Sequence, residues 1–174
     1  MEYELRYPSP VGGLTIQANA SGITVLVLEE DAHRERYLSS PAAPCVPGEE
    51  PELLAKTRQW LDDYFAGKNP DISALSLTPF GTAFQEKVWR TLRSIPYGET
   101  VTYGALAAQL NSSPRAVGSA VGRNPISILI PCHRVVGTDG SLTGYAGGLP
   151  AKRALLALEG VALDQTQNRL ARDQ

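Results

Sequence analysis

The stretch Ile128–Val136 places three chemically active side chains in a row: the thiol of Cys132, the imidazole of His133 and the guanidinium of Arg134. A cysteine with an ordinary pKa of about 8.5 is only a few per cent thiolate at neutral pH. A neighbouring base or positive charge would raise that fraction, and both are present here. From these residues alone, an inert buried cysteine and a nucleophilic one both stay open.

The backbone around this thiol must be irregular if the two side chains are to cooperate. Adjacent residues of a regular strand or helix point in different directions. Pro131 fixes its own φ and biases Ile130 toward an extended conformation, so a bend at this point is expected.

A carboxylate near the end of the chain has an unusual position. The segment "AKRALLALEG" predicts a final amphipathic helix that Gly160 ends, and Glu159 falls in its last turn. The helix macrodipole disfavours a negative charge there. Either Glu159 is an ordinary surface carboxylate, or it has a specific cationic or hydrogen-bonded partner.

The first third of the chain predicts an antiparallel sheet followed by a helix. The proline-rich segment "SSPAAPCVPGEEP" reads as a loop, in which Cys45 is an ordinary surface thiol. Apolar residues recur at helical spacing from Pro51 to Phe65, and a linker then leads to a boundary near residue 79. The expected strands are Glu2–Tyr7, Leu14–Ala18 and Ile23–Leu28.

The second half predicts several short helices. Thr82 and Gln85 form a capping box before an apolar face that Pro96 ends. Thr102 caps a second helix, and Ser113 with Pro114 begins a third that runs to about Gly122, so the last two form a helix-turn-helix. The third helix, "PRAVGSAVG", carries mostly small residues, which suit either close approach to another molecule or close internal packing.

The composition restricts the cellular compartment and the binding partners of the protein. No apolar run is long enough to span a bilayer, and the first residues lack a secretory core, so we expect a cytoplasmic protein without a membrane partner. Two cysteines and two histidines, without metal-binding spacing, make a structural zinc site improbable. Residues 1–79 hold 6 basic and 12 acidic side chains, whereas residues 80–160 hold 8 basic and 4 acidic ones. Any anion-binding surface is therefore expected in the second half, although chance clustering stays open.

The second half resembles the O6-alkylguanine-DNA alkyltransferases. Five segments look like segments of that family in the same order: "IPYGETVTYGALA", "RAVGSAVGRNP", "ILIPCHRVVG", "LTGYAGG" and "KRALLALEG". The resemblance implies an α+β fold with a small N-terminal antiparallel-sheet domain with a helix and a mainly helical C-terminal domain. The expected divisions are 1–79 for the N-terminal domain with its linker, 80–160 for the alkyltransferase and DNA-binding domain, and 161–174 for a polar tail.

The resemblance also implies roles for individual residues. Cys132 would accept the alkyl group, His133 would act as base through a water, and Glu159 would orient the imidazole and stabilise its charged form. Asn124 would link the helix-turn-helix to the thiol by hydrogen bonds. Tyr103 would hydrogen-bond or protonate the departing guanine, and backbone groups around Val135 and Ala146 would hold the base.

The implied partner is double-stranded DNA that contains O6-alkylguanine, with O4-alkylthymine as a second substrate. The small-residue helix would lie in the minor groove while the damaged nucleotide is flipped out of the stack. Arg115 would fill the vacated place, and Thr102, Ala116, Arg123 and Arg134 would also contact DNA. A monomer in solution is expected, and cooperative binding along DNA stays open.

The expected product is a thioether, which has no easily displaced group, so each molecule would act once and without a cofactor. Three other functions stay open from the sequence. A binding protein would recognise alkylguanine without transfer, a thiol hydrolase would turn over repeatedly, and a transcription factor would prefer particular sequences.

Overall fold

The computed structural model describes residues 2–39, 42–46 and 48–171, in two compact units. Unit 1 consists of Met1–Phe80 and Pro125–Leu129, and unit 2 consists of Gly81–Asn124 and Ile130–Gln174. Part of the predicted polar tail, residues 172–174, lies outside the described residues. The mixed α+β class is confirmed, with an antiparallel sheet in unit 1 and mainly helices in unit 2.

The predicted strands form a meander in unit 1. Strands β1 (Tyr3–Ser9), β2 (Gly12–Asn19) and β3 (Gly22–Leu28) pair antiparallel in sequence order. Two short elements were not predicted: helix α1 (Arg34–Tyr37), and strand β4 (Ala43–Pro44), which pairs parallel with β1 inside the expected loop. The sheet order is therefore β3-β2-β1-β4.

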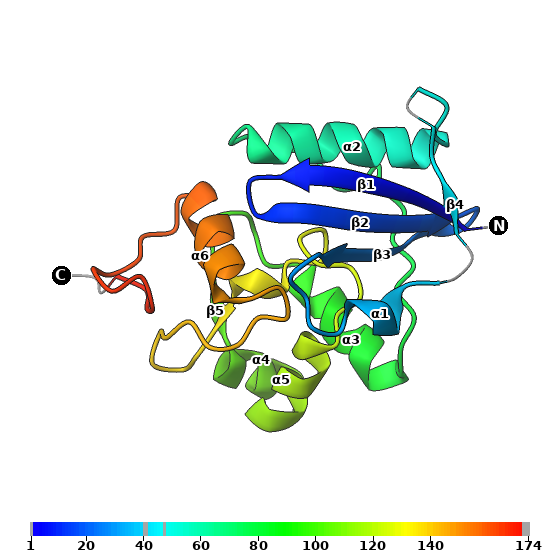
Figure 1. Ribbon diagram of the computed structural model, residues 1–174. Helices are drawn as coiled ribbons and strands as arrows, with labels where there is room; N and C mark the ends of the chain where they lie inside the picture. Colours follow the sequence, from blue (N-terminus) through cyan, green and yellow to red (C-terminus); the bar gives the residue numbers. More distant parts are fainter. Residues whose placement is uncertain (1, 40–41, 47, 172–174) are drawn as a thin grey trace. The chain divides into compact units, whose positions relative to one another are not determined.

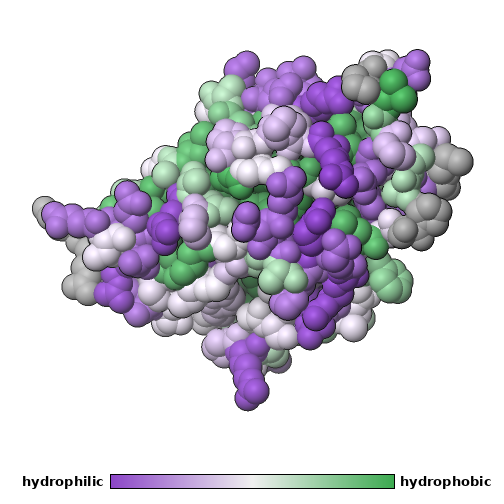
Figure 2. All heavy atoms as spheres, viewed as in Figure 1, coloured by the Kyte–Doolittle hydropathy of each residue, from purple (hydrophilic) through white to green (hydrophobic). Residues whose placement is uncertain are grey.

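One long helix covers this sheet. Helix α2 (Glu52–Phe65) lies along β1 and β2, as Figure 1 shows, and confirms the helix predicted from its apolar spacing. Leu54, Leu61 and Tyr64 are fully buried on its inner face. The outer face of α2 is largely hydrophilic (Figure 2), as expected for a helix with one apolar side.

The free edge of β3 binds a segment from far along the chain. The N–H of Leu26 donates to the carbonyl of Pro125 at 2.9 Å, and the N–H of Ser127 donates back to the carbonyl of Leu26 at 2.9 Å. Ile128 has a φ of +69°, a strained conformation for a β-branched residue. No local sequence pattern indicates this pairing, which assigns residues 125–129 to unit 1.

Unit 2 begins with three capped helices. In α3 (Ala83–Leu92), Thr82 and Gln85 form the predicted capping box. Helix α4 (Tyr103–Gln109) is capped by the Thr102 hydroxyl, and α5 (Pro114–Gly122) by the Ser113 hydroxyl. The indole N–H of Trp89 donates to the carbonyl of Ala120 at 2.8 Å and so ties α5 to α3. The helix-turn-helix of α4 and α5 is thus fixed to the rest of the unit.

The remaining elements of unit 2 surround the cysteine. A single 3₁₀ turn, η1 (Cys132–Arg134), leads into β6 (Val135–Val136), which pairs parallel with β5 (Val101–Thr102). Helix α6 (Leu149–Leu158) follows, and Gly160 after it has a φ of +83°, as predicted for a glycine that ends a helix. The chain then continues into a hairpin at residues 161–171, described below.

Candidate active site

The thiol lies on an irregular turn, as predicted. Pro131 has φ −80° and ψ 65°, and the N–H of Cys132 donates to the carbonyl of Ile130 at 2.8 Å. The single 3₁₀ turn that follows orients Cys132 and His133 differently from neighbours in a strand. Cys132 is 6% exposed. A thiolate at this position raises the pKa of both the Tyr103 phenol and the Lys152 ammonium. Polar, ionisable groups therefore border this buried sulfur.

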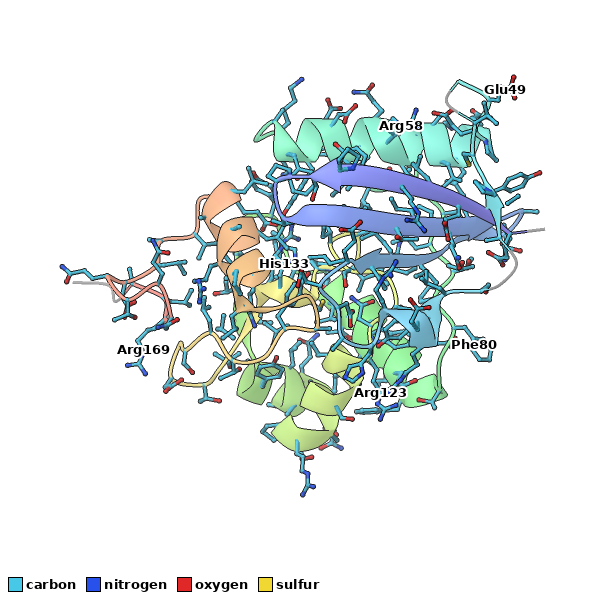
Figure 3. The ribbon with its side chains drawn as sticks, viewed as in Figure 1. Glu49, Arg58, Phe80, Arg123, His133 and Arg169 are labelled. Atoms are coloured by element: carbon cyan, nitrogen blue, oxygen red, sulfur yellow. The ribbon has the colours of Figure 1, made fainter. Side chains whose placement is uncertain are left out.

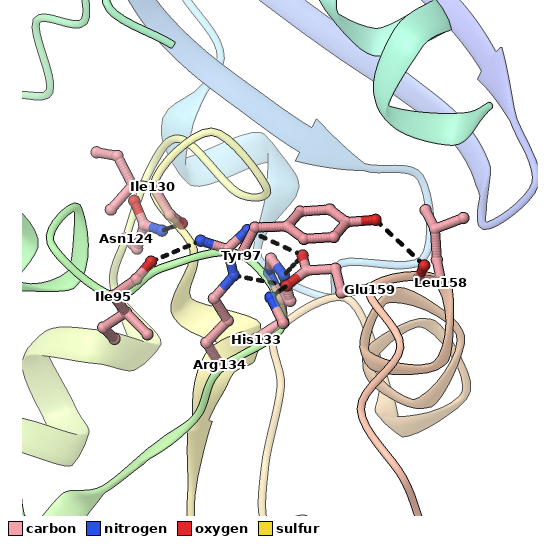
Figure 4. A network of polar contacts seen from close by, with 9 residues as sticks. Ile95, Tyr97, Asn124, Ile130, His133, Arg134, Leu158 and Glu159 are labelled. Atoms are coloured by element: carbon pink, nitrogen blue, oxygen red, sulfur yellow. Dashed lines mark hydrogen bonds and ion pairs between the residues drawn. The ribbon is translucent and has the colours of Figure 1, made fainter. Parts of the chain in front are cut away.

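Asn124 connects the end of α5 to this turn. Its side chain is buried, and its Nδ2 donates to the carbonyl of Ile130 at 2.9 Å (Figure 4). The same carbonyl accepts the N–H of Cys132, so one oxygen joins the helix-turn-helix to the residue that carries the thiol.

The imidazole of His133 is fully buried and contacts Glu159. Its Nε2 lies 2.6 Å from Oε2 of Glu159, whose side chain is also fully buried (Figure 4). Burial lowers the pKa of His133; the hydrogen bond and charge of Glu159 oppose this effect, and the charges of Arg134 and Lys152 lower the pKa further. A neutral imidazole is favoured, with the Nε2 proton donated to Glu159.

The second ring nitrogen is then a base. Nδ1 of His133 is buried and has no hydrogen-bond partner among the described residues. With the proton held at Nε2, the lone pair of Nδ1 is available to accept another proton.

Glu159 is held by a guanidinium rather than by an imidazolium. Nε and Nη2 of Arg134 bind its two oxygens at 2.7 and 3.0 Å, and the N–H of Gly98 donates to Oε1 at 3.1 Å. The bidentate pair offsets the unfavourable position of Glu159 at the end of α6. The expected contact between Glu159 and the imidazole of His133 is present, and Arg134 is a second partner that was not expected.

The placement of Arg134 corrects its predicted DNA contact. Its side chain is only 11% exposed, and Nη1 donates to the carbonyl of Ile95 at 2.7 Å. All three guanidinium nitrogens are thereby bound to protein oxygens. The guanidinium also lies 5.9 Å from the centre of the Tyr97 ring, and the Tyr97 hydroxyl donates to the carbonyl of Leu158 (Figure 4). Arg134 is therefore an internal partner of Glu159.

Tyr103, the first residue of α4, is a neutral donor. Burial raises the pKa of its phenol, the charge of Cys132 raises it further, and a hydrogen bond with the Thr143 hydroxyl lowers it in part. A phenol kept protonated at neutral pH can donate a proton or a hydrogen bond to a departing anion.

Lys152 is a buried charged residue that was not predicted as part of the site. It is fully buried in α6, and its Nζ donates to the carbonyls of Val135, Thr143 and Gly144 at 2.7, 2.9 and 3.4 Å. Burial lowers its pKa to about 8, while the charge of Cys132 raises it. The available signal was its spacing, because Lys152 shares a helix face with the buried Leu155 and Leu156.

The other predicted site residues lie on β6, in the loop before α6, and on or beside α4 and α5. Val135 is buried, with its N–H on the carbonyl of Cys132 and its own carbonyl on Lys152. Ala146 is half-buried in the loop before α6. Arg115 and Arg123 are exposed at the two ends of α5, and Figure 3 shows Arg123 at the surface. Ala116 and Thr102 are half-buried.

No group of three or more histidine, cysteine, aspartate or glutamate side chains is arranged to hold a metal ion within residues 2–39, 42–46 and 48–171. In the same ranges, no helix has both the length and the apolar character needed to cross a membrane.

Both halves of the chain match models of one protein family. Residues 3–79 match "6-O-methylguanine DNA methyltransferase, ribonuclease-like domain", and residues 83–161 match "6-O-methylguanine DNA methyltransferase, DNA binding domain".

Named relatives and solved structures agree with these family models. The Haemophilus influenzae methylated-DNA–protein-cysteine methyltransferase is 46% identical over 159 residues, which cover 90% of this chain and 86% of the relative. The Mycobacterium tuberculosis protein of the same name is 43% identical, with 87% and 88% covered. A crystal structure of M. tuberculosis O6-methylguanine methyltransferase has a TM-score of 0.77 at 41% identity, with 91% and 93% covered. A structure of the M. tuberculosis protein in complex with DNA also has a TM-score of 0.77, at 38% identity, with 96% and 95% covered.

Fold and site together define a protein with a buried thiol, imidazole and carboxylate in the same unit as a helix-turn-helix. The chain belongs to the 6-O-methylguanine DNA methyltransferase family.

Proposed function

We propose that this protein repairs DNA by moving the alkyl group of O6-alkylguanine onto its own Cys132, once per molecule. The observation that carries the proposal is the state of His133. A neutral imidazole bound to Glu159 through Nε2, with an available lone pair on Nδ1, is a base. It belongs to the residue that directly follows Cys132, the only cysteine of the turn. Family membership supplies the substrate class.

The first step is activation of the thiol. A water between the two residues passes the proton of Cys132 to Nδ1 of His133, and Glu159 then faces an imidazolium. Arg134 keeps Glu159 oriented toward that imidazolium. The ammonium of Lys152 favours the thiolate through its positive charge.

The second step is displacement at the alkyl carbon. The sulfur forms a bond to carbon, the bond between carbon and O6 breaks, and guanine leaves with the electron pair. Tyr103 donates a hydrogen bond or proton to the departing base, which is a poor leaving group as an anion. The backbone around Val135 and Ala146 holds the edge of the base. The thioether that remains has no good leaving group, so water or cellular thiols do not restore Cys132.

DNA binding uses the helix-turn-helix. Ala, Gly and Ser along α5 allow its backbone to approach the minor groove closely, and the exposed Arg115 enters the stack that the flipped nucleotide leaves. Flipping costs roughly a few kcal/mol, which these contacts must offset. Ala116, Thr102 and Arg123 complete the contact. Low sequence preference follows, because small side chains do not reach the base edges that distinguish sequences.

We also infer a monomer that works in the cytoplasm. Cys45 and Cys132 are both reduced thiols, which is the usual state in a reducing compartment. The domain divisions 1–79, 80–160 and 161–174 and a second reaction with O4-alkylthymine belong to the same proposal.

Intact-mass measurement tests the transfer. After incubation with duplex DNA that contains O6-methylguanine, the protein should gain the mass that results when a methyl group replaces the thiol hydrogen. Cys132→Ser should gain nothing, and the matched variant Cys45→Ser should gain as much as the unchanged protein. An unchanged mass of the natural protein would show a binding protein, and labelling of Cys132→Ser would place the acceptor elsewhere.

A further inference from the structure

The C-terminal hairpin of the chain, residues 161–171, was expected to belong to a polar tail but is folded. Leu163 and Leu170 pair antiparallel, and the N–H of Asp164 donates to the carbonyl of Arg169 at 2.9 Å. The N–H of Ala171 donates to the carbonyl of Ala162 at 3.0 Å. Residues 162–171 lie beyond the end of the matched family model at residue 161.

The hairpin binds a loop that begins at the active-site strand. The N–H of Leu142 donates to the carbonyl of Asn168 at 2.7 Å, and the N–H of Leu170 donates to the carbonyl of Gly140 at 2.9 Å. Ser141 and Arg169 form an antiparallel bridge between these two bonds, and Arg169 also pairs with Asp139 at 3.0 Å. Figure 3 shows Arg169 in this terminal segment.

Apolar packing strengthens the contact. The side chains of Val136, Leu142 and Leu156 form a buried cluster, and half-buried side chains of the hairpin and its neighbours cover it: Leu149, Val161, Leu163 and Leu170. Val136 belongs to the strand that follows the thiol turn. The hairpin is thus bound to both ends of the stretch from Val136 to Leu142.

The loop continues directly into the proposed base-binding residues. Thr143 follows Leu142, and its hydroxyl hydrogen-bonds to Tyr103 while its carbonyl accepts from Lys152. Ala146, the proposed pocket wall, comes three residues later and is only half-buried. Movement of residues 140–142 would therefore also move Thr143, the hydrogen-bond partner of Tyr103, and Ala146, the proposed wall of the base pocket.

We propose that the hairpin determines substrate specificity: by binding residues 140–142 it restricts the loop that carries Thr143 and Ala146, and so limits the size of alkyl group that Cys132 can reach. The hairpin residues are positioning residues, since none of them is placed against the reacting atoms. This inference rests on the proposed function, because it concerns which alkyl groups that reaction accepts.

Two substitutions at Leu170 test this specificity role in the full-length protein. Leu170→Ser removes the side chain from the cluster, and Leu170→Pro also removes the N–H that binds Gly140. Leu170→Met keeps volume and apolar character and should behave like the natural protein. Leu53→Ser is the matched control, because Leu53 is also a half-buried leucine but lies on α2 in unit 1.

The measurement is the ratio of two single-turnover rates, for O6-benzylguanine and O6-methylguanine in the same DNA duplex. Both Leu170→Ser and Leu170→Pro should raise the benzyl-to-methyl ratio by about tenfold, the usual size of discrimination by a pocket that excludes an extra apolar group. Leu170→Met and Leu53→Ser should leave the ratio unchanged.

Three results would overturn the proposal: an unchanged ratio in both Leu170 variants, a lower ratio, or the same increase in Leu53→Ser. The ratio separates a specificity role from general destabilisation, which slows both reactions together. If the natural protein transfers neither group, it is the proposed function that fails, and this outcome is distinct from an unchanged ratio.

Discussion

Replacement of Arg134 by methionine should destabilise the protein and change the protonation of its base. Methionine retains the apolar stem but removes all three donor nitrogens, so Glu159 loses its bidentate partner while its contacts with His133 and the N–H of Gly98 remain. Removing one partner of a buried ion pair costs about 3–5 kcal/mol, because the other charge remains buried. We expect a loss of that size in the free energy of unfolding, measured by urea denaturation.

The same change should move the acid limb of the rate profile. The charge of Arg134 lowers the pKa of His133, so its removal raises that pKa toward the ordinary value of about 6.5 or above. A base with a raised pKa is protonated over a wider range, and transfer should therefore begin to fail at a higher pH than in the natural protein. Single-turnover rates on methylated duplex DNA across a pH series would measure the shift.

Two controls make the result specific. Arg134→Lys keeps a positive charge but not the bidentate geometry, so its acid limb should lie nearer that of the natural protein. Arg90→Met alters an exposed arginine of α3 and should change stability by less than about 0.5 kcal/mol. A loss of under about 1 kcal/mol in Arg134→Met, together with an unmoved acid limb, would refute the reasoning.

Three smaller predictions concern Lys152, Arg115 and Ser113. The pKa of Lys152 is about 8 when folded and 10.5 when unperturbed, so the unfolded chain binds more protons between these values. Relative to Lys152→Met, the unfolding free energy of the natural protein should therefore rise by about 3 kcal/mol from pH 8 to pH 10.5 in urea titrations, and parallel curves would contradict this. Arg115→Ala should slow repair of duplex DNA by about tenfold but leave a single-stranded substrate nearly unaffected, because only the duplex pays the extrusion cost; equal slowing on both would argue against a role in flipping. Ser113→Ala removes the hydroxyl that accepts the N–H of Ala116 at 3.1 Å and should cost about 1 kcal/mol of unfolding free energy, which thermal or urea denaturation would detect.

The Arg134–Glu159 pair contributes to the chemistry of the site rather than to the stability of the fold. Buried ion pairs often contribute little net stability, because desolvation of both charges offsets their attraction. Here the pair gives Glu159 a fixed orientation and a compensated charge, and it leaves His133 neutral. The neutral state of His133 can also be tested at acidic pH. As the pH falls below about 6.5, His133 gains a proton in the unfolded chain but not in the folded protein, so the free energy of unfolding falls.

Local signals predicted the elements of the fold well. Thr82, Thr102 and Ser113 cap the helices that their spacing indicated, and Gly160 ends the last one. Strand alternation gave the meander of unit 1. Two pairings could not be predicted: residues 125–129 with β3, and residues 140–142 with 168–170. Both use backbone N–H and C=O groups, which do not depend on the type of side chain.

The site was predicted in part, for a similar reason. A bend at Pro131 follows from local rules and is present, whereas local rules left open whether Glu159 has a specific partner. The family resemblance implied the contact of Glu159 with His133, but no sequence pattern indicated that Arg134 binds the same carboxylate. Lys152 was missed because its spacing fits an apolar face, and only the fold shows three carbonyls around its ammonium.

The stoichiometry of repair tests the central claim most directly. With DNA containing O6-methylguanine in large excess, chromatography of the digested DNA would count the guanines restored per protein molecule. Irreversible transfer to Cys132 predicts a plateau at one guanine per molecule, with the methyl group found on the peptide that carries this residue. Continued repair beyond one equivalent, or a plateau without a methylated Cys132, would contradict the account.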